Sequence, residues 1–336
     1  MPSIELIPEL YREEAQKMAG CLDQLDEVLL AAHANLDGDA LGSLCAAAII
    51  LRQLGKTFTI YSSTAVPRHL QFVKLPTKVY TELALINPFP KTALFLDCGE
   101  YHRLGVELSS AASNFPSLNL DHHEGLGMGS LATWVEPKAA STTQLLAYLA
   151  LAKGLDLSGD LGQAIALGLV TDTGGFAHTN TSADVFALSA HLAKLGVDFP
   201  RLREELDHNI RFERMLLWGG LTKKVQLEAN GSIAICTVSL ADFQTYSAMR
   251  DDLEGFVEYL RRLQGVKIAV LLREDEPHTA KFSLRSVREV DVCSLARKLG
   301  GGGHKNAAGG TINQPLEQAK MTLLKILLDG LNKSLL

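Results

Sequence analysis

The sequence has few cysteines, no long hydrophobic run and no basic leader, and each absence excludes a class of protein. Its five cysteines are widely spaced and include no Cys-x-x-Cys pair, which is typical of reduced thiols in a cytoplasm rather than of a disulfide framework. The longest apolar stretch, residues 40–51, contains a Gly-Ser pair and ends at Arg52, so it is shorter than the roughly 18 residues that a membrane span needs. The first ten residues hold two glutamates and no basic segment, so no signal peptide is expected. We therefore predict a cytoplasmic protein with no membrane association.

The chain also lacks an excess of positive charge. It has 32 Lys and Arg residues against 38 Asp and Glu residues, a net charge of −6. Proteins that bind long nucleic acid present a basic surface, because neutralisation of phosphates dominates their affinity. Long nucleic acid is therefore disfavoured as a partner, and a phosphate-containing substrate is expected to be short and held locally. The composition is that of an ordinary globular chain, and 336 residues suggest about two domains.

The first part of the chain alternates predicted strands and helices, which indicates a mostly parallel sheet flanked by helices. A more charged helical stretch, 199–225, is expected to connect the domains. The remainder predicts a smaller α+β domain with a hairpin around Asn230-Gly231, a dipeptide that suits a tight turn. The domain prediction is 1–195, a helical linker 196–220, and 221–336. Strands are predicted at 28–33, 57–62, 92–97, 117–121, 226–229, 232–238, 266–273 and 279–286, and the other helices at 4–25, 39–54, 141–153, 159–170, 182–195, 291–299 and 316–331.

Metal-competent side chains follow four predicted apolar elements. The most informative cluster is Asp121-His122-His123, directly after a short apolar run. Because the carboxyl ends of strands in an open α/β sheet line one crevice, four such ends predict one shared metal site. The candidate ligands in the four clusters are His33, Asp37 and Asp39, then Asp97, then Asp121, His122 and His123, and finally Asp172.

Each cluster taken alone also has a structural explanation. Asp39 suits a helix cap, Asp37-Gly38 suits a turn, and Asp97 and Asp172 suit the ends of elements. Taken together, however, unneutralised carboxylates would repel one another, and bound cations remove that problem. Mixed carboxylate and imidazole ligation favours Mn²⁺, with Co²⁺, Zn²⁺ or Mg²⁺ as alternatives. Two ions about 3.5–4 Å apart would activate a shared water and neutralise a phosphate.

A glycine run in the second predicted domain is a candidate phosphate site. Glycines 300–303 precede His304 and Lys305, and successive backbone N–H groups of such a run can form an anion-binding nest. Glycines alone would indicate only a flexible loop. Arg285, at the end of a polar strand, adds a guanidinium that suits a phosphate. The predicted substrate-binding residues here are Arg285, Gly301, Gly302, Gly303 and His304.

These motifs resemble those of the DHH phosphoesterases, specifically the DHH–DHHA1 subgroup of stand-alone nanoRNase/pAp phosphatase (NrnA-like) proteins. The resemblance covers nearly the whole chain. It implies a catalytic DHH domain with a mostly parallel sheet, followed by a smaller α+β DHHA1 domain that binds substrate. One departure is Leu36, where many relatives have proline, and it removes no ligand. The matching motifs are His33…Asp37-Gly38-Asp39, Asp97, Asp121-His122-His123, Asp172 and residues 300–309.

The resemblance also implies roles for these residues. Asp97 would bridge two metal ions, His123 would face the substrate phosphate or leaving group, and Asp121 would orient the histidines. Arg103 would lie near the substrate, and the second domain would close over the metals with the nucleotide. The first ion would be held by His33, Asp37 and Asp97, and the second by Asp39, Asp97, His122 and Asp172.

By resemblance, the expected activity is Mn²⁺-dependent hydrolysis of short oligoribonucleotides to 5′-mononucleotides and of 3′-phosphoadenosine 5′-phosphate (pAp) to AMP. One alternative keeps the chemistry and changes the substrate to cyclic di-AMP or pApA. An alternative of another class is a nucleotide-binding regulator without catalysis, but such a protein should have lost a ligand, and every expected ligand position is filled. Relatives are often dimers, so a homodimer is expected from the family alone.

Overall fold

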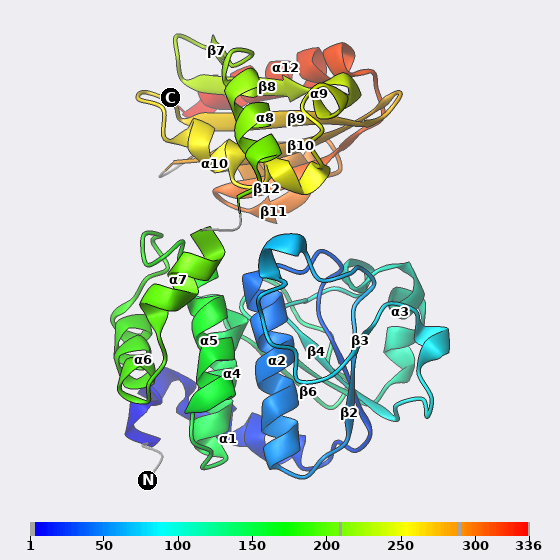
Figure 1. The fold of residues 1–336 in the computed structure, drawn as a ribbon, viewed down its shortest axis with the longest axis vertical. Coiled ribbons are helices and arrows are strands. Elements are labelled where there is room, and N and C mark those ends of the chain that lie inside the picture. Colours follow the sequence, from blue (N-terminus) through cyan, green and yellow to red (C-terminus); the bar gives the residue numbers. More distant parts are fainter. Residues whose placement is uncertain (1–3, 208–209, 288–289, 335–336) are drawn as a thin grey trace. The chain divides into compact units, whose positions relative to one another are not determined.

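The computed structural model describes residues 4–207, 210–287 and 290–334 and divides into two compact units, Met1–Asn209 and Ile210–Leu336 (Figure 1). The division falls inside the predicted linker. Helix α7 (Phe199–Asp207) contributes Leu202 to the core of the first unit, whereas α8 (Phe212–Thr222) contributes Leu217 and Leu221 to the second. Residues 208 and 209 of the predicted connecting helix lie outside the described residues. Within the described ranges, no helix has both the length and the apolar character needed to cross a lipid bilayer.

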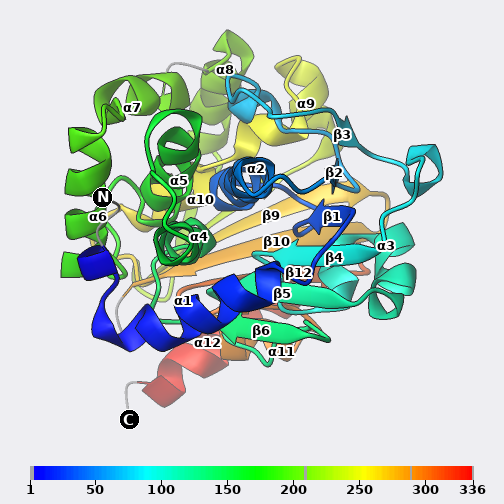
Figure 2. The same cartoon turned by 90° about the horizontal axis from the view of Figure 1, so that it is seen from below.

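The first unit is built on a six-stranded parallel sheet in the order β3-β2-β1-β4-β5-β6 (Figure 2). All four predicted strands are present, and two short strands, β3 and β6, add to them. The chain moves outward from β1 to β2 and β3, then returns to place β4 on the other side of β1, so the strand order reverses between β1 and β4. A ligand crevice is expected at the carboxyl ends of such a pair. The strands are β1 (Val28–Ala31), β2 (Phe58–Tyr61), β3 (Val79–Tyr80), β4 (Thr92–Leu96), β5 (Ser117–Asp121) and β6 (Ala132–Val135).

Both faces of this sheet are covered, which explains its continuous apolar strands. In β1, Val28 and Leu30 pack into the core on one face, and Leu29 and Ala31 pack into a second core on the other. Helices α1 (Glu9–Leu22), α2 (Gly38–Gln53), α4 (Thr142–Ala152) and α5 (Gly159–Asp172) cover the first face, and α3 (Val106–Ala111) covers the second. Helix α6 (Ala183–Lys194) packs on α5. The 3-10 turns of this unit are Ile4–Leu6, Arg68–Leu70, Leu83–Leu85, Tyr101–Leu104 and Ala112–Asn114.

Helices α2 and α5 pack closely because glycines lie at their contact. A Cβ atom on Gly42 would lie 2.6 Å from the Ala164 carbonyl oxygen, and one on Gly168 would lie 2.2 Å from Asp39 Oδ1. The pair therefore holds the start of α2 beside the end of α5. Asp172 ends helix α5, so the expectation that all four acidic clusters follow strands is wrong at this position. The helix predicted at 159–170 is confirmed, and it delivers Asp172 from its C-terminal end.

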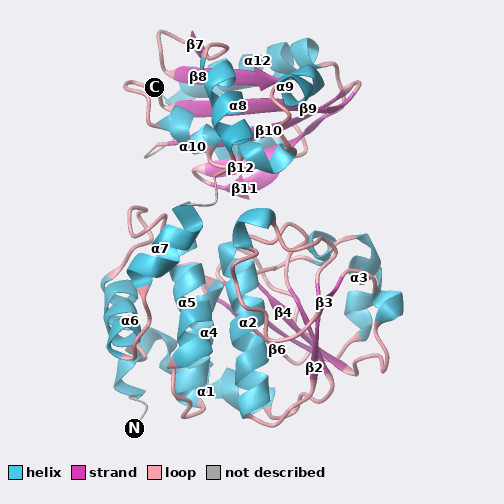
Figure 3. Ribbon diagram, viewed as in Figure 1, coloured by secondary structure: helices cyan, strands magenta, loops and turns pink. Residues whose placement is uncertain are grey.

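The second unit contains a mixed six-stranded sheet in the order β11-β12-β10-β9-β8-β7, drawn in magenta in Figure 3. Strands β7 and β8 form the predicted hairpin, whereas β8 and β9 run parallel. The glycine run, for which no strand is predicted, contains an edge strand, since Gly302 to His304 pair with β12. The predicted α+β class is confirmed. The elements are β7 (Gln226–Glu228), β8 (Ile233–Val238), α9 (Leu240–Thr245), a 3-10 turn (Arg250–Leu253), α10 (Phe256–Arg261), β9 (Ile268–Glu276), β10 (Thr279–Ser286), α11 (Val292–Arg297), β11 (Gly302–His304), β12 (Ala307–Ile312) and α12 (Leu316–Ser334).

Candidate metal centre

The predicted ligands converge at the carboxyl ends of β1 and β4, where the strand order reverses. His33 follows β1, and Asp97 directly follows β4. Asp97 has a left-handed φ of 54°, which non-glycine residues seldom adopt. Its N–H donates to the Leu120 carbonyl at 2.9 Å, so the neighbouring strand holds it in this conformation. Asp37 caps α2, accepting the Ala40 N–H at 2.9 Å, and Asp39 lies in the first turn of that helix.

Asp97 lies at the middle of the cluster, and its two carboxylate oxygens face different partners. Oδ2 lies 3.3 Å from His33 Nε2. Oδ1 lies 3.5 Å from His122 Nε2 and 3.3 Å from His123 Nδ1. The side chain is buried. One carboxylate thus joins two sets of donor atoms, as a bridging ligand requires.

The donor atoms form three groups, within each of which all atoms lie within 4.8 Å of one another. In the group around His33, its Nε2 is 3.5 Å from Asp37 Oδ2. In the group around His122, its Nε2 is 3.1 Å from Asp172 Oδ2 and 3.8 Å from Asp39 Oδ2. The structure therefore brings every predicted metal ligand into one cluster. The groups are His33, Asp37 and Asp97; Asp39, His122 and Asp172; and Asp97, His122 and His123.

Each histidine of the Asp121-His122-His123 motif is held by a different acceptor. Asp121 Oδ1 lies 2.7 Å from His123 Nδ1, which agrees with an orienting role for Asp121. His122 is held instead by the Ala139 carbonyl, 3.4 Å from its Nδ1. A carbonyl only accepts, so Nδ1 of His122 carries the proton and Nε2 points toward Asp39, Asp97 and Asp172. This is the arrangement that metal-binding histidines usually show.

The carboxylates raise the pKa of all three imidazoles. Burial disfavours the charged form of His33, but the nearby carboxylates of Asp37 and Asp97 outweigh burial and raise its pKa to about 10. Burial likewise opposes the charged form of His122, while Asp172 and the neighbouring carboxylates raise its pKa to about 10. The pKa of His123 is raised to about 9, since Asp121 and Asp97 overcome burial. In the absence of metal, protonated imidazoles balance the carboxylates.

The donor set fits divalent cations. Burial raises the pKa of the Asp39 carboxyl, and the nearby charges of Asp97 and Asp172 raise it further. Burial also raises the pKa of Asp172 to about 6, even though His122 opposes this shift. His33 Nε2 is buried and has no hydrogen-bond partner. A cation stabilises both the buried like charges and an imidazole nitrogen that makes no hydrogen bond, and mixed oxygen and nitrogen donors suit Mn²⁺, Co²⁺ or Zn²⁺.

Thr142, which sequence reasoning missed, also belongs to the site. Its hydroxyl donates to Asp97 Oδ1 at 3.1 Å, and its N–H donates to Asp39 Oδ2 at 2.7 Å. The Thr143 N–H donates to Asp39 Oδ1 at 3.0 Å. A Ser-Thr-Thr run before a helix is an ordinary N-cap signal, so nothing in the sequence indicated these contacts.

The contacts described for the predicted substrate-binding residues are with other groups of the protein. Arg103 lies in a 3-10 turn, and its carbonyl accepts the Ala34 N–H at 2.7 Å, so its main chain is tied beside His33. In the second unit, Arg285 Nε donates to Glu258 Oε1 at 2.6 Å. Gly303 has a φ of 137°, and a Cβ there would lie 2.4 Å from the Ala307 carbonyl oxygen, so the hairpin itself requires this glycine. Substrate binding by these residues stays a prediction.

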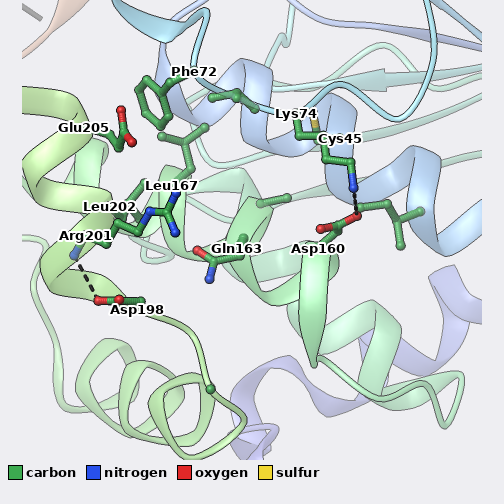
Figure 4. Close-up of a pocket in the computed structure, with 14 residues that line it drawn as sticks. Cys45, Phe72, Lys74, Asp160, Gln163, Leu167, Asp198, Arg201, Leu202 and Glu205 are labelled. Atoms are coloured by element: carbon green, nitrogen blue, oxygen red, sulfur yellow. Dashed lines mark hydrogen bonds and ion pairs between the residues drawn. The ribbon is translucent and has the colours of Figure 1, made fainter.

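A cavity of about 450 Å³ lies elsewhere in the first unit, between α2, α5, α7 and the loop that contains Phe72 (Figure 4). Its wall combines apolar side chains such as Leu167 with Arg201 and Gln163. None of the metal-competent side chains of the cluster lines it. This cavity is therefore separate from the Asp97 cluster.

Comparison with known proteins agrees with the geometry. Residues 27–169 match the N-terminal domain of the DHH family, and residues 230–333 match the DHHA1 domain. The chain is 28% identical over 327 residues to the "Bifunctional oligoribonuclease and PAP phosphatase NrnA" of Thermus thermophilus, covering 96% of each chain. It is 26% identical to the Bacillus subtilis protein of the same name, covering 85% of this chain and 90% of that one.

A solved structure shows the same fold. The exopolyphosphatase-related protein of Bacteroides fragilis superposes with a TM-score of 0.84 at 24% identity, covering 96% of both chains. The two domain matches together span more than half of the sequence. The chain is therefore a member of the DHH–DHHA1 phosphoesterases, and it is a hydrolase.

Proposed function

We propose that this protein is a Mn²⁺-dependent phosphoesterase that hydrolyses short oligoribonucleotides to 5′-mononucleotides and pAp to AMP. The observation that carries the proposal is the placement of Asp97 between two groups of metal-competent side chains. The names of the relatives from Thermus thermophilus and Bacillus subtilis support both substrates. The five unpaired cysteines agree with the cytoplasm as its location, and a homodimer stays a prediction.

The side chains of the cluster account for the chemistry. Two ions, when bound, would supply an activated water and offset the charge of the phosphate. His33, Asp37 and Asp97 would hold one ion, and Asp39, Asp97, His122 and Asp172 the other. His123 is held by Asp121 through Nδ1, and Asp121 and Asp97 raise its pKa to about 9 in the metal-free protein. It is therefore suited to donate a proton from Nε2 to the oxygen that leaves phosphorus.

We expect purified protein with Mn²⁺ to convert a labelled RNA dinucleotide to 5′-mononucleotides and pAp to AMP, because both substrates are short and carry an accessible phosphoester. A panel of pAp, pApA, RNA dinucleotide to pentanucleotide, and cyclic di-AMP, each assayed with Mn²⁺, Co²⁺, Zn²⁺ and Mg²⁺, measures this. Preferential turnover of cyclic di-AMP would replace the substrate assignment. Tight binding of these nucleotides without turnover under any metal would refute catalysis and identify a regulator.

Metal uptake should release protons, and metal affinity should rise with pH. The imidazoles of His33 and His122, the two histidines assigned as ligands, have raised pKa values of about 10 in the metal-free protein, so they are protonated at pH 7. A metal ion needs the neutral ring nitrogen and must displace these protons. Calorimetry of Mn²⁺ binding in buffers of different ionisation enthalpy measures the release. Binding without proton release at pH 7, and with the same affinity at pH 9, would contradict the assigned ligands.

The same pKa shifts predict the pH dependence of stability without metal. A histidine whose pKa is higher in the folded state stabilises that state fully below its unfolded pKa of about 6.5, and this stabilisation is lost as pH rises toward 10. The metal-free protein should therefore lose melting temperature between pH 7 and pH 10. Manganese-loaded protein should lose less, because the neutral rings are then held by the ion.

A further inference from the structure

One short segment of the first unit makes hydrogen bonds to His122, to Asp39 and to the Asp97 oxygen that faces His122. This segment, residues 139–143, leads into helix α4 and is called here the α4 N-terminal segment. Ala139, Ala140, Ser141, Thr142 and Thr143 are all at most 2% exposed. Its sequence contains no group that binds a metal strongly, so any contribution to the site must be made by positioning other residues.

The segment contacts two ligands of the His122 group, His122 and Asp39, by separate hydrogen bonds. The Ala139 carbonyl accepts from His122 Nδ1 at 3.4 Å. The N–H groups of Thr142 and Thr143 donate to the two oxygens of Asp39 at 2.7 and 3.0 Å. Both N–H groups belong to the first turn of α4, where the helix dipole favours a negative charge.

Asn180 connects the segment to Asp172. Its Nδ2 donates to the Ala140 carbonyl and to the Asp172 carbonyl, both at 3.2 Å. The end of helix α5 is thereby fixed to the segment through its main chain. The position of the Asp172 carboxylate, 3.1 Å from His122 Nε2, follows from this link and from the close packing of α2 and α5.

Thr142 completes the set because its hydroxyl selects one oxygen of the bridging carboxylate. It donates to Asp97 Oδ1, the oxygen that faces His122, and not to Oδ2, the oxygen that faces His33. The contacts described for the His33 group come instead from the helix cap at Asp37 and from the main chain around Ala34. The two halves of the cluster therefore have different supports.

We propose that the α4 N-terminal segment positions the ligands of the second ion selectively, and that Thr142 is its principal positioning residue. This inference rests on the proposed function in assuming that the cluster takes up two ions. Without the Thr142 hydroxyl, Asp97 Oδ1 loses the hydrogen bond that holds it beside His122, whereas the first group keeps its own support at the helix cap of Asp37. Loss of such an outer contact typically lowers metal affinity about 10–100-fold.

The decisive experiment is Mn²⁺ titration of the full-length chain, followed by calorimetry and by electron paramagnetic resonance, which separates a single ion from a coupled pair. Thr142→Val keeps the volume and removes the hydroxyl. We expect it to bind the first ion as wild type does and the second about 10–100-fold more weakly. Thr142→Ser restores the hydroxyl and should restore the coupled pair.

A matched control lies on the other side of the cluster. The Thr64 hydroxyl donates to the Ala34 carbonyl beside His33, so Thr64→Val removes a similar bond next to the first group. It should leave the second ion unaffected. Should Thr142→Val fail to fold, Asn180→Leu tests the same segment through its link to Asp172 and should give the same selective loss.

If Thr142→Val binds both Mn²⁺ ions with wild-type affinity, the inference is overturned. An equal loss of affinity for both ions would overturn it as well. The same two outcomes apply to Asn180→Leu where that variant replaces Thr142→Val. Wild-type protein that binds a coupled pair and turns over no phosphoester would refute the proposed function alone. Wild-type protein that takes up a single ion would overturn both.

Discussion

Replacing Asp97 with asparagine is expected to lower phosphoesterase activity by about 10³-fold, the upper end of the loss seen when one preorganised electrostatic contact is removed. The amide keeps the size of the side chain and supplies one neutral carbonyl oxygen in place of two charged ones. The two oxygens of Asp97 face His33 on one side and the His122–His123 pair on the other. Both ions therefore lose a ligand at once. Steady-state turnover of pAp and of an RNA dinucleotide at saturating Mn²⁺ measures the effect.

The matched control is Asp156→Asn. Asp156 is exposed, and its side chain accepts the Ser158 N–H at 2.7 Å, a bond that the asparagine carbonyl can keep. This variant should retain wild-type turnover and both ions. An Asp97→Asn protein that folds, binds two ions and turns over substrate within tenfold of wild type would remove Asp97 from the reaction.

The sequence predicted which side chains would converge, because each is a chemically distinctive residue placed after an apolar element. Asp121-His122-His123 and Asp97 follow strands that are buried on both faces, and such strands are easily detected from their hydrophobicity. Parallel strands must present their carboxyl ends at one edge, so convergence followed from the fold class. The predicted architecture and the relationship to DHH–DHHA1 phosphoesterases are confirmed on the same grounds.

The supporting contacts could not be predicted in the same way. The Ala139 carbonyl and the N–H groups of Thr142 and Thr143 act through the main chain, which is the same for every residue type. No strand is predicted at β11, since Gly302 and Gly303 have low strand propensity. Its pairing with β12 depends on a close approach of the two backbones. Glycine permits this approach, but a run of glycines does not predict a strand.

Replacing Gly168 with alanine is expected to destabilise the first unit and weaken metal binding, although alanine is the better helix former. Within α5, the change would favour the helix by about 1 kcal/mol. The new Cβ, however, would lie 2.2 Å from both Asp39 Oδ1 and Thr143 Oγ1, and these atoms belong to buried residues. Overpacking of this kind typically costs about 1–3 kcal/mol, so the clash outweighs the propensity.

Gly20→Ala is the control that separates these two effects. Gly20 lies in helix α1, and a Cβ there meets no atom within 4 Å, so only the gain in helix propensity remains, up to about 1 kcal/mol. Melting in a chelator should thus shift downward for Gly168→Ala and slightly upward for Gly20→Ala, while Mn²⁺ affinity should fall only in the former. Equal upward shifts in both variants would show that α2 and α5 have room to separate. In that case their close approach would not hold Asp39 and Asp172 in place, and the ligand geometry would have to be maintained by the α4 N-terminal segment alone.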